Sequence, residues 1–200
     1  MIAISLMQKA LGEQWASLPP ALRAHYQAQD NTDLGRLDIE FPAGMSPFLW
    51  LLHGMGALIH RRGQALPATV EKRMNEQGQQ HWHRRVLFAD GRTVAFRSRW
   101  VYPGGNELIE FVNPLLGLRM AVEVIDGQLH YSGRHFVLQL GTLRLPLPEA
   151  LLGHTTIVET ALNEAGFAMD FRLTHPLFGL IYRYHGEFVA QSQEGVPTGF

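Results

Sequence analysis

Alternating apolar and polar residues run through most of the chain after residue 67 and predict one antiparallel strand after another. The clearest pair of strands lies on either side of Asp90-Gly91. The apolar residues expected on their shared face are Trp82, Val86, Phe88, Val94, Phe96 and Trp100. The two sets share a face only if the loop has an odd number of residues. We therefore predict the three-residue loop Ala89-Asp90-Gly91, with Gly91 in the left-handed conformation.

Two polar residues, Arg84 and Ser98, interrupt this apolar face. An unpaired guanidinium in such a place would cost several kcal/mol, so Arg84 requires a partner. We predict that Arg84 points into the concave side of the sheet near Ser98 and anchors the anionic or carbonyl end of an apolar ligand. The alternative is that Glu110, backbone carbonyls or solvent satisfy the guanidinium.

The connection to the next strand bears directly on whether Glu110 is that partner. The turn at Pro103-Gly104-Gly105-Asn106 favours a loop of two or four residues. This register places Ile109 and Phe111 on the same face as Trp100 and turns Glu110 outward. The guanidinium is then left without a carboxylate.

Two further hairpins follow from turn signals. Asp126-Gly127 is a strong two-residue turn, and its register brings the apolar residues of both flanking strands onto one face. Ala165-Gly166 is interpreted as another two-residue turn. That register places Glu159 opposite Arg172, as an ion pair on a solvated face.

The first part of the chain predicts helices and one strand. Apolar residues at helical spacing indicate an amphipathic helix over residues 2–11, and Pro19-Pro20 begins a second short helix. Residues 35–41 are a candidate first strand, and the polar segment 70–76 is typical of an edge strand. The N-terminus lacks the basic start and small-residue cleavage site of a secretory signal, so we expect none.

Residues 47–59 form the most apolar segment of the chain. It is well short of the roughly 20 residues that a membrane-spanning helix needs, so we expect no stable membrane insertion. We predict a helix covered by the sheet and a protein that stays in the supernatant when liposomes are sedimented. The alternative is a helix that binds at the membrane interface.

One short pattern occurs twice, at residues 113–118 and 175–180, as x-Pro-Leu-x-Gly-Leu. Each copy follows one strand and opens another, where proline ends pairing and glycine redirects the chain. We interpret the pair as a corner reached twice independently, with internal duplication as the alternative.

These elements predict an α+β fold with two or three N-terminal helices packed on, or capping, a curved antiparallel meander of about 8 to 10 strands. The sheet would form a half-barrel or close into a barrel. We expect a single domain over residues 1–200, with residues 1–66 mainly helical and residues 67–200 forming the sheet.

The composition limits which partners and which kinds of chemical site we expect. The net charge is -1, with charges of both signs interspersed, so we expect no field that attracts nucleic acid or anionic lipid. The chain has no cysteine, which excludes disulfides and thiolate metal sites and is typical of a cytoplasmic protein.

Several segments together resemble the bacterial family catalogued as domain of unknown function 4166. The segments that carry the resemblance are Trp82–Phe88, Leu108–Phe111, Asn113–Tyr131, Leu145–Pro148 and His175–Phe188. The likeness extends over roughly residues 15–188. It implies that members occur alone or joined to nicotinamide-dependent oxidoreductase domains, and it implies no activity and no catalytic residues. The chain has no Gly-x-Gly-x-x-Gly motif, so we expect no nucleotide site and no cofactor.

Other chemical motifs give little support for an enzyme. His81 and His83 share a strand face, but no third ligand lies at suitable spacing, so we interpret them as surface histidines and expect no metal site. No nucleophile elbow, zinc-binding His-Glu-x-x-His or phosphate loop is present. A site assembled only by the fold would leave no such trace.

Three functional hypotheses follow. The preferred one is non-catalytic binding of a small, largely apolar or acidic, lipid-like ligand inside the sheet. The candidate ligand-binding residues are Trp82, Arg84, Phe96, Ser98, Trp100, Tyr131, Tyr182 and Tyr184. The alternatives are an accessory domain that docks onto a nicotinamide-dependent oxidoreductase, and an enzyme with a fold-assembled site. A cavity above roughly 300 Å³ would favour ligand binding, and a filled core with a broad exposed apolar patch would favour docking.

Overall fold

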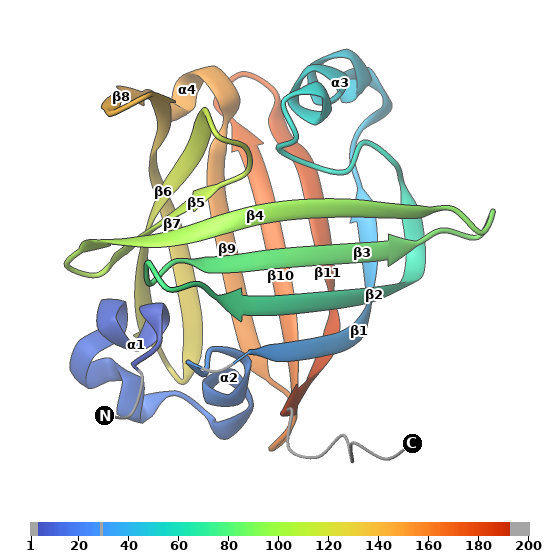
Figure 1. The fold of residues 1–200 in the computed structure, drawn as a ribbon. Helices are drawn as coiled ribbons and strands as arrows, with labels where there is room; N and C mark the ends of the chain where they lie inside the picture. Colours follow the sequence, from blue (N-terminus) through green and yellow to red (C-terminus); the bar gives the residue numbers. More distant parts are fainter. Residues whose placement is uncertain (1–3, 29, 193–200) are drawn as a thin grey trace.

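The computed structural model describes residues 4–28 and 30–192 (Figure 1). Strands make up most of it. They are β1 (Asn31–Glu40), β2 (Gly63–Met74), β3 (Gln80–Leu87), β4 (Thr93–Gly104), β5 (Glu107–Phe111), β6 (Leu116–Ile125), β7 (Gln128–Leu140), β8 (Leu143–Leu147), β9 (His154–Ala161), β10 (Gly166–His175) and β11 (Gly179–Ser192). The helical segments are α1 (Leu6–Leu11), η1 (Gly12–Ser17), α2 (Pro20–His25), η2 (Ala43–Met45), α3 (Ser46–Gly54) and α4 (Glu149–Leu152).

Within the described residues, ten of these strands form one closed antiparallel barrel. Strands adjacent in sequence pair with one another from β1 to β8 and from β9 to β11, and the pairings of β7 with β9 and of β1 with β11 complete the circle. β7 is long enough to pair with β9 along its first half and with the short strand β8 along its second half. The fold is therefore mostly β and the barrel is closed. The predicted α+β class and the half-barrel alternative are both corrected.

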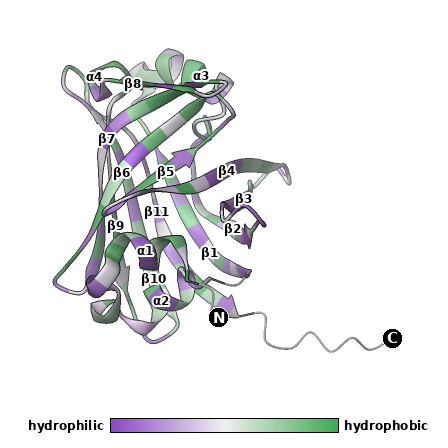
Figure 2. Cartoon of the chain, turned by 60° about the vertical axis from the view of Figure 1, so that its left-hand side comes forward, coloured by the Kyte–Doolittle hydropathy of each residue, from purple (hydrophilic) through white to green (hydrophobic). Residues whose placement is uncertain are grey.

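The short helices lie at the two ends of the barrel (Figure 1). α1, η1 and α2 lie at one end, called here the α2 end. α3, α4 and β8 lie at the other, the α3 end, and Figure 2 shows the same separation from a second side. One continuous cluster of buried apolar side chains fills the barrel. A small separate cluster of Ile109, Phe111 and Val137 lies on the opposite face of the sheet.

Two predicted hairpins are confirmed in register. Val86 pairs with Val94 across the three-residue loop Ala89-Asp90-Gly91, and Gly91 has φ of 80°. Val122 pairs with Tyr131, and the two-residue turn has φ of 50° at Asp126 and 76° at Gly127. In both hairpins the turn residues allow the positive φ that the matching of faces requires.

The register predicted for the β9–β10 hairpin is wrong. Glu159 pairs with Met169 and not with Arg172. The Asn163 side chain accepts hydrogen bonds from the backbone of Ala165, at 3.0 Å, and of Gly166, at 2.7 Å. The turn therefore spans three residues instead of two. This change of parity moves Glu159 from the solvated face to the barrel interior, where it is 2% exposed.

The register predicted for β4 and β5 is also wrong. Trp100 pairs with Glu110, and a bulge between Val101 and Gly104 shifts the pairing by one residue before the turn. An added residue exchanges the two faces of the strand that follows. Glu110 therefore points into the barrel, whereas Ile109 and Phe111 belong to the separate cluster outside.

Closure of the barrel changes two further expectations. β2 is not an edge strand, because it pairs with β1 on one side and β3 on the other. The first strand begins at Asn31, so residues 1–66 contain β1 and the start of β2 besides the helices.

The predicted helix in residues 47–59 is shorter than expected and is not covered by the sheet. α3 closes the end of the barrel with Leu49 and Leu52, whereas Trp50 is 69% and Leu51 54% exposed. A helix across the mouth of a barrel can bury only its inner face. In the part of the chain that the structure describes, no helix combines the length and apolarity needed to cross a membrane.

Candidate functional site

The barrel encloses a cavity of about 130 Å³. Seven of the eight predicted ligand-binding residues line it: Trp82, Arg84, Phe96, Trp100, Tyr131, Tyr182 and Tyr184. The eighth, Ser98, is buried and reaches the cavity through its hydrogen bond with Arg84. They converge because β3, β4, β7 and β11 alternate their side chains and the barrel directs one face of each strand inward.

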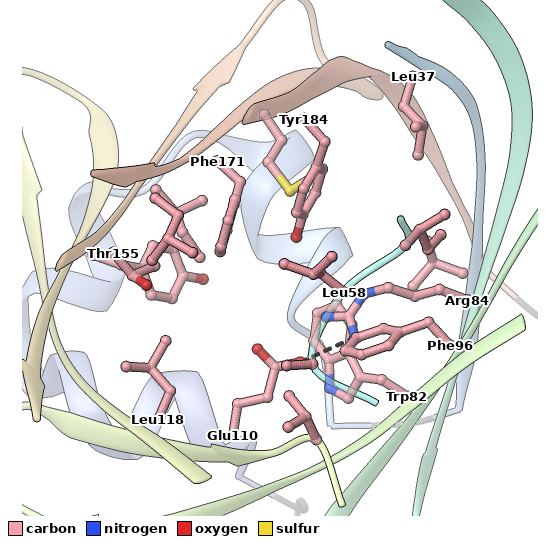
Figure 3. A pocket seen from close by; sticks show the side chains of 18 of the residues that line it. Leu37, Leu58, Trp82, Arg84, Phe96, Glu110, Leu118, Thr155, Phe171 and Tyr184 are labelled. Atoms are coloured by element: carbon pink, nitrogen blue, oxygen red, sulfur yellow. Dashed lines mark hydrogen bonds and ion pairs between the residues drawn. The ribbon is translucent and has the colours of Figure 1, made fainter. Parts of the chain in front are cut away.

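Arg84 lies between two partners on the cavity wall (Figure 3). Its Nη1 donates to Ser98 Oγ at 2.8 Å and to Glu110 Oε1 at 3.0 Å. The guanidinium also lies 4.6 Å from the ring of Trp82 and 5.3 Å from that of Phe96. The predicted inward orientation beside Ser98 is thus confirmed, and the predicted absence of a carboxylate is wrong. Burial lowers the pKa of Arg84, but Glu110 outweighs it and holds the pKa above its ordinary value.

Aromatic rings surround this ion pair. Trp82 stacks on Trp100 with ring centroids 4.7 Å apart, and Tyr131 meets Trp100 edge to face at 6.1 Å. On the opposite wall, Phe171 stacks on Tyr184 at 4.6 Å. The cavity therefore offers flat apolar surfaces on two sides of one polar centre.

Two groups on the wall retain hydrogen-bonding capacity. The Tyr184 side chain points its hydroxyl into the cavity (Figure 3), and no partner for that hydroxyl is found among the described residues. Glu110 uses only Oε1 toward Arg84, so its other oxygen can still accept a hydrogen bond. Tyr182 differs, because its hydroxyl already donates to the carbonyl of Ile59 at 3.1 Å.

A second polar cluster lies where α2 enters the barrel. Asp33 Oδ2 lies 2.8 Å from both Lys72 Nζ and His25 Nδ1, and all three side chains are almost fully buried. Burial alone would raise the pKa of Asp33, but its interactions with His25 and Lys72 lower it below its ordinary value. Burial lowers the pKa of His25 to about 4 and also lowers that of Lys72. The cluster is thus an ion pair between Asp33 and Lys72 beside a neutral imidazole.

Glu159 belongs to the same region and is a buried acid with a strongly raised pKa. Its two carboxyl oxygens lie 2.8 and 2.9 Å from the Tyr26 hydroxyl, which in turn accepts a hydrogen bond from Tyr131. Burial raises the pKa of Glu159 to about 8, although Tyr26 and Lys72 oppose the change. A carboxyl with this pKa can hold or release a proton near neutral pH.

Sequence reasoning missed this cluster almost entirely. Lys72 had a usable signal, since it continues the inward row of Leu66, Ala68 and Val70 just as Arg84 interrupts an apolar row. His25 and Asp33 had none, because a short helix and a strand with mixed burial do not show which side chains point inward. Glu159 was lost through the wrong hairpin register.

The structure also bears on the predicted surface histidines. His81 and His83 lie on β3 with their side chains at least partly exposed, and His83 Nδ1 lies 3.8 Å from Glu71. Across residues 4–28 and 30–192, no group of three or more His, Cys, Asp or Glu side chains could hold a metal ion.

The family comparison agrees with the resemblance seen in the sequence. The model of the family described as "Domain of unknown function (DUF4166)" matches residues 18–188. The chain belongs to this family. The match spans α2 to β11 and so includes every residue of both polar clusters. A search of curated proteins finds no match.

Proposed function

We propose that this DUF4166 protein binds, without transforming it, a compact and largely apolar molecule that carries one hydroxyl or carbonyl group. The observation that carries the proposal is the Tyr184 hydroxyl, which faces an aromatic cavity with no partner among the described residues. Tyr184 would donate to a carbonyl or hydroxyl oxygen, and the free oxygen of Glu110 would accept a hydroxyl proton. The stacked rings would hold the rest of the molecule.

Two features define the ligand more narrowly than the sequence did. Glu110 neutralises Arg84 at 3.0 Å, so the described residues that line the cavity supply no free cation to hold a carboxylate. A cavity of about 130 Å³ falls below the volume expected for drug-sized or lipid-like ligands. It resembles instead the small apolar cavities that accept a single ring. The proposal is therefore a neutral, ring-sized ligand and no longer an acidic lipid.

Native mass spectrometry of the purified protein would detect a retained ligand and give its mass. In parallel, benzyl alcohol can be titrated into ligand-free protein by calorimetry. We expect Tyr184→Phe to weaken binding about tenfold, by loss of one hydrogen bond, with little change in unfolding free energy. Tyr182→Phe is the matched control, since its hydroxyl is bonded to backbone. It should lower stability by about 1 kcal/mol and leave binding unchanged. No binding by wild type, or equal losses in both variants, would contradict the proposal.

A second candidate is an enzyme that transfers protons on a small carbonyl compound. The observation favouring it is Glu159, which lines the cavity beside Tyr26 and Tyr131 and has a pKa of about 8. A carboxyl of this kind can act as a general base near neutral pH, and the two phenols can stabilise the oxyanion that forms. Tyr26 donates to Glu159, and Tyr131 donates to Tyr26. Once Glu159 has taken the substrate proton, its carboxylic acid can donate to Tyr26, and the reversed chain leaves the Tyr131 hydroxyl free to donate to the oxyanion.

Deuterium exchange tests this second candidate without knowledge of the natural substrate. Cyclohexanone in D₂O can be followed by proton NMR for loss of its α-hydrogens in the presence of protein. Catalysed exchange that is lost in Glu159→Gln, with benzyl alcohol binding retained, would establish proton transfer. Binding without exchange would leave the non-catalytic proposal as the sole account of the cavity.

A further inference from the structure

The α3 end of the barrel exposes most of the large apolar side chains found at the surface. Of the seventeen large hydrophobic residues exposed in the described chain, ten lie on α3, α4, β8 and the neighbouring strand ends and turns. The most prominent are Leu177, 80% exposed, Trp50, 69%, Leu151, 58%, and Phe178, 57%. Figure 1 shows these elements together at one end of the barrel, and Figure 2 shows the hydrophobic residues of α3 there.

Hydrogen bonds and ring contacts join the separate segments of this end into one surface. The Asn113 side chain donates to the carbonyl of Met55, which follows α3. His175, at the second copy of the repeated corner, hydrogen-bonds to the carbonyl of Ala150 in α4 and lies 6.5 Å from the ring of Phe48 in α3. The two corners of the x-Pro-Leu-x-Gly-Leu pattern therefore expose the leucine that follows proline, Leu115 and Leu177, on the same surface.

The exposed apolar segments at this end carry basic residues and no acidic ones. The segments 41–62, 111–117, 138–148 and 174–181 contain no Asp or Glu, whereas they contain Arg61, Arg62 and Arg144. Arg61 pairs with Asp90 at 2.9 Å. Arg62 and Arg144 have no carboxylate partner among the described residues; their guanidiniums lie over the rings of Phe41, at 4.6 Å, and Phe111, at 5.6 Å. The acids that adjoin these segments all have partners: Glu40 lies 3.8 Å from Arg183, Glu110 3.0 Å from Arg84 and Glu149 2.7 Å from His154.

We propose that the α3 end docks onto an anionic lipid surface, with Trp50, Leu51, Leu177 and Phe178 inserted among the lipid headgroups. Apolar tips bordered by arginines, with no unpaired carboxylate, match the two attractions that hold proteins at such a surface. The inference goes beyond ligand binding and does not depend on it.

The same observations disfavour a second copy of the chain as the occupant. A two-fold contact through this end would bring the arginines of both copies to one interface, where no unpaired carboxylate could form ion pairs with them. The sequence led us to expect a covered helix and a protein that stays in the supernatant when liposomes are sedimented. Because α3 is exposed, the proposal is instead that the protein binds them.

The test is co-sedimentation of the full chain with vesicles of phosphatidylcholine, with and without phosphatidylserine, at physiological salt. We expect binding to the anionic vesicles only. Trp50→Gln/Leu51→Gln should weaken it about tenfold or more, through loss of apolar insertion. Arg144→Gln should weaken it about fivefold. The matched control is Ile125→Gln/Leu162→Gln, which changes side chains 42% and 50% exposed at the end of β6 and directly after β9, where these strands turn at the α2 end, and it should bind as wild type does.

Three results would overturn the proposal. They are absence of sedimentation with anionic vesicles, equal losses in the control variant, and binding that is indifferent to Trp50 and Arg144. Sedimentation velocity of the same proteins distinguishes the other occupants. A dimer that is lost in the Trp50→Gln/Leu51→Gln variant would assign the surface to a second copy. A complex with a nicotinamide-dependent oxidoreductase domain, lost in that variant while vesicles are not bound, would assign it to a protein partner.

Discussion

The two ends of the barrel differ in which side chains they bury and which they expose. At the α2 end, charged and polar side chains from α2, β1, β2 and β9 are buried, and each ionised group has a partner. At the α3 end, apolar side chains are exposed and two arginines have no carboxylate among the described residues. Buried charges are tolerated only when paired, whereas exposed apolar surface is tolerated until something covers it. The α2 end thus buries paired charges, whereas the α3 end leaves apolar side chains exposed for the lipid contact proposed above.

The largest expected effect is at Asp33. Asp33→Ala leaves Lys72 as an unpaired buried cation, and we expect a loss of about 3 to 5 kcal/mol in unfolding free energy. Urea denaturation followed by fluorescence measures it. Asp33→Leu/Lys72→Met removes both charges and should be markedly more stable than the single variant. A loss of no more than about 1 kcal/mol in the single variant, which is the value of a solvated pair, would contradict the assignment of Asp33 and Lys72 as a buried ion pair.

The next largest loss of unfolding free energy is expected at Arg84, in the middle of the barrel. Arg84→Met strands the Glu110 carboxylate beside aromatic rings, and we expect a loss of about 3 kcal/mol, because both side chains are less than one-fifth exposed. This differs from the role of a ligand anchor, which would affect binding with little change in stability. Arg84→Met/Glu110→Leu should recover much of the loss. Denaturant midpoints of the two variants distinguish a paired structural ion from a free anchor.

The pH dependence of stability reports on Glu159. Its pKa is about 8 in the folded protein against an ordinary value of 4.5, so the folded state binds the proton more tightly. Its contribution is fully present below pH 4.5 and is lost as pH rises toward 8. His25 acts in the opposite direction, but only between its ordinary 6.5 and its folded pKa of about 4. Between pH 6.5 and 8, stability should therefore fall by up to about 1.4 kcal/mol per pH unit.

Thermal or urea unfolding at a series of pH values measures this slope. Glu159→Gln keeps a neutral hydrogen-bonding group at the position and should remove the decline above pH 6.5. A wild-type profile that is flat or rising in that window would contradict the raised pKa.

The smallest change in unfolding free energy is expected at the α3 end of the barrel. Trp50→Gln/Leu51→Gln changes side chains that are 69% and 54% exposed, so unfolding free energy should shift by less than about 0.5 kcal/mol. Leu52→Gln is the matched control on the same helix, because Leu52 is 3% exposed and its replacement places an amide in the core. A large loss in the double variant would show that these side chains hold α3 in place.

The sequence by itself determined the local features of this protein. Period-two alternation showed which residues share a strand face, and glycine-containing turns set two hairpins in register, so Trp82, Arg84 and Ser98 were correctly placed together. The charge of Arg84 within an apolar row indicated a polar centre. These features depend on residues close in sequence, whose geometry the backbone restricts directly.

Tertiary structure alone decided what completes that centre. A bulge in β4 and an Asn163 side chain in the β9–β10 turn each changed the parity of one hairpin, and this brought Glu110 and Glu159 inward. Closure of the barrel then placed Tyr26 beside Glu159, 133 residues away. A one-residue shift reverses every side chain of a strand, and contacts between distant residues depend on the summed packing of the whole barrel. No local pattern in the chain shows that Tyr26 and Glu159 meet.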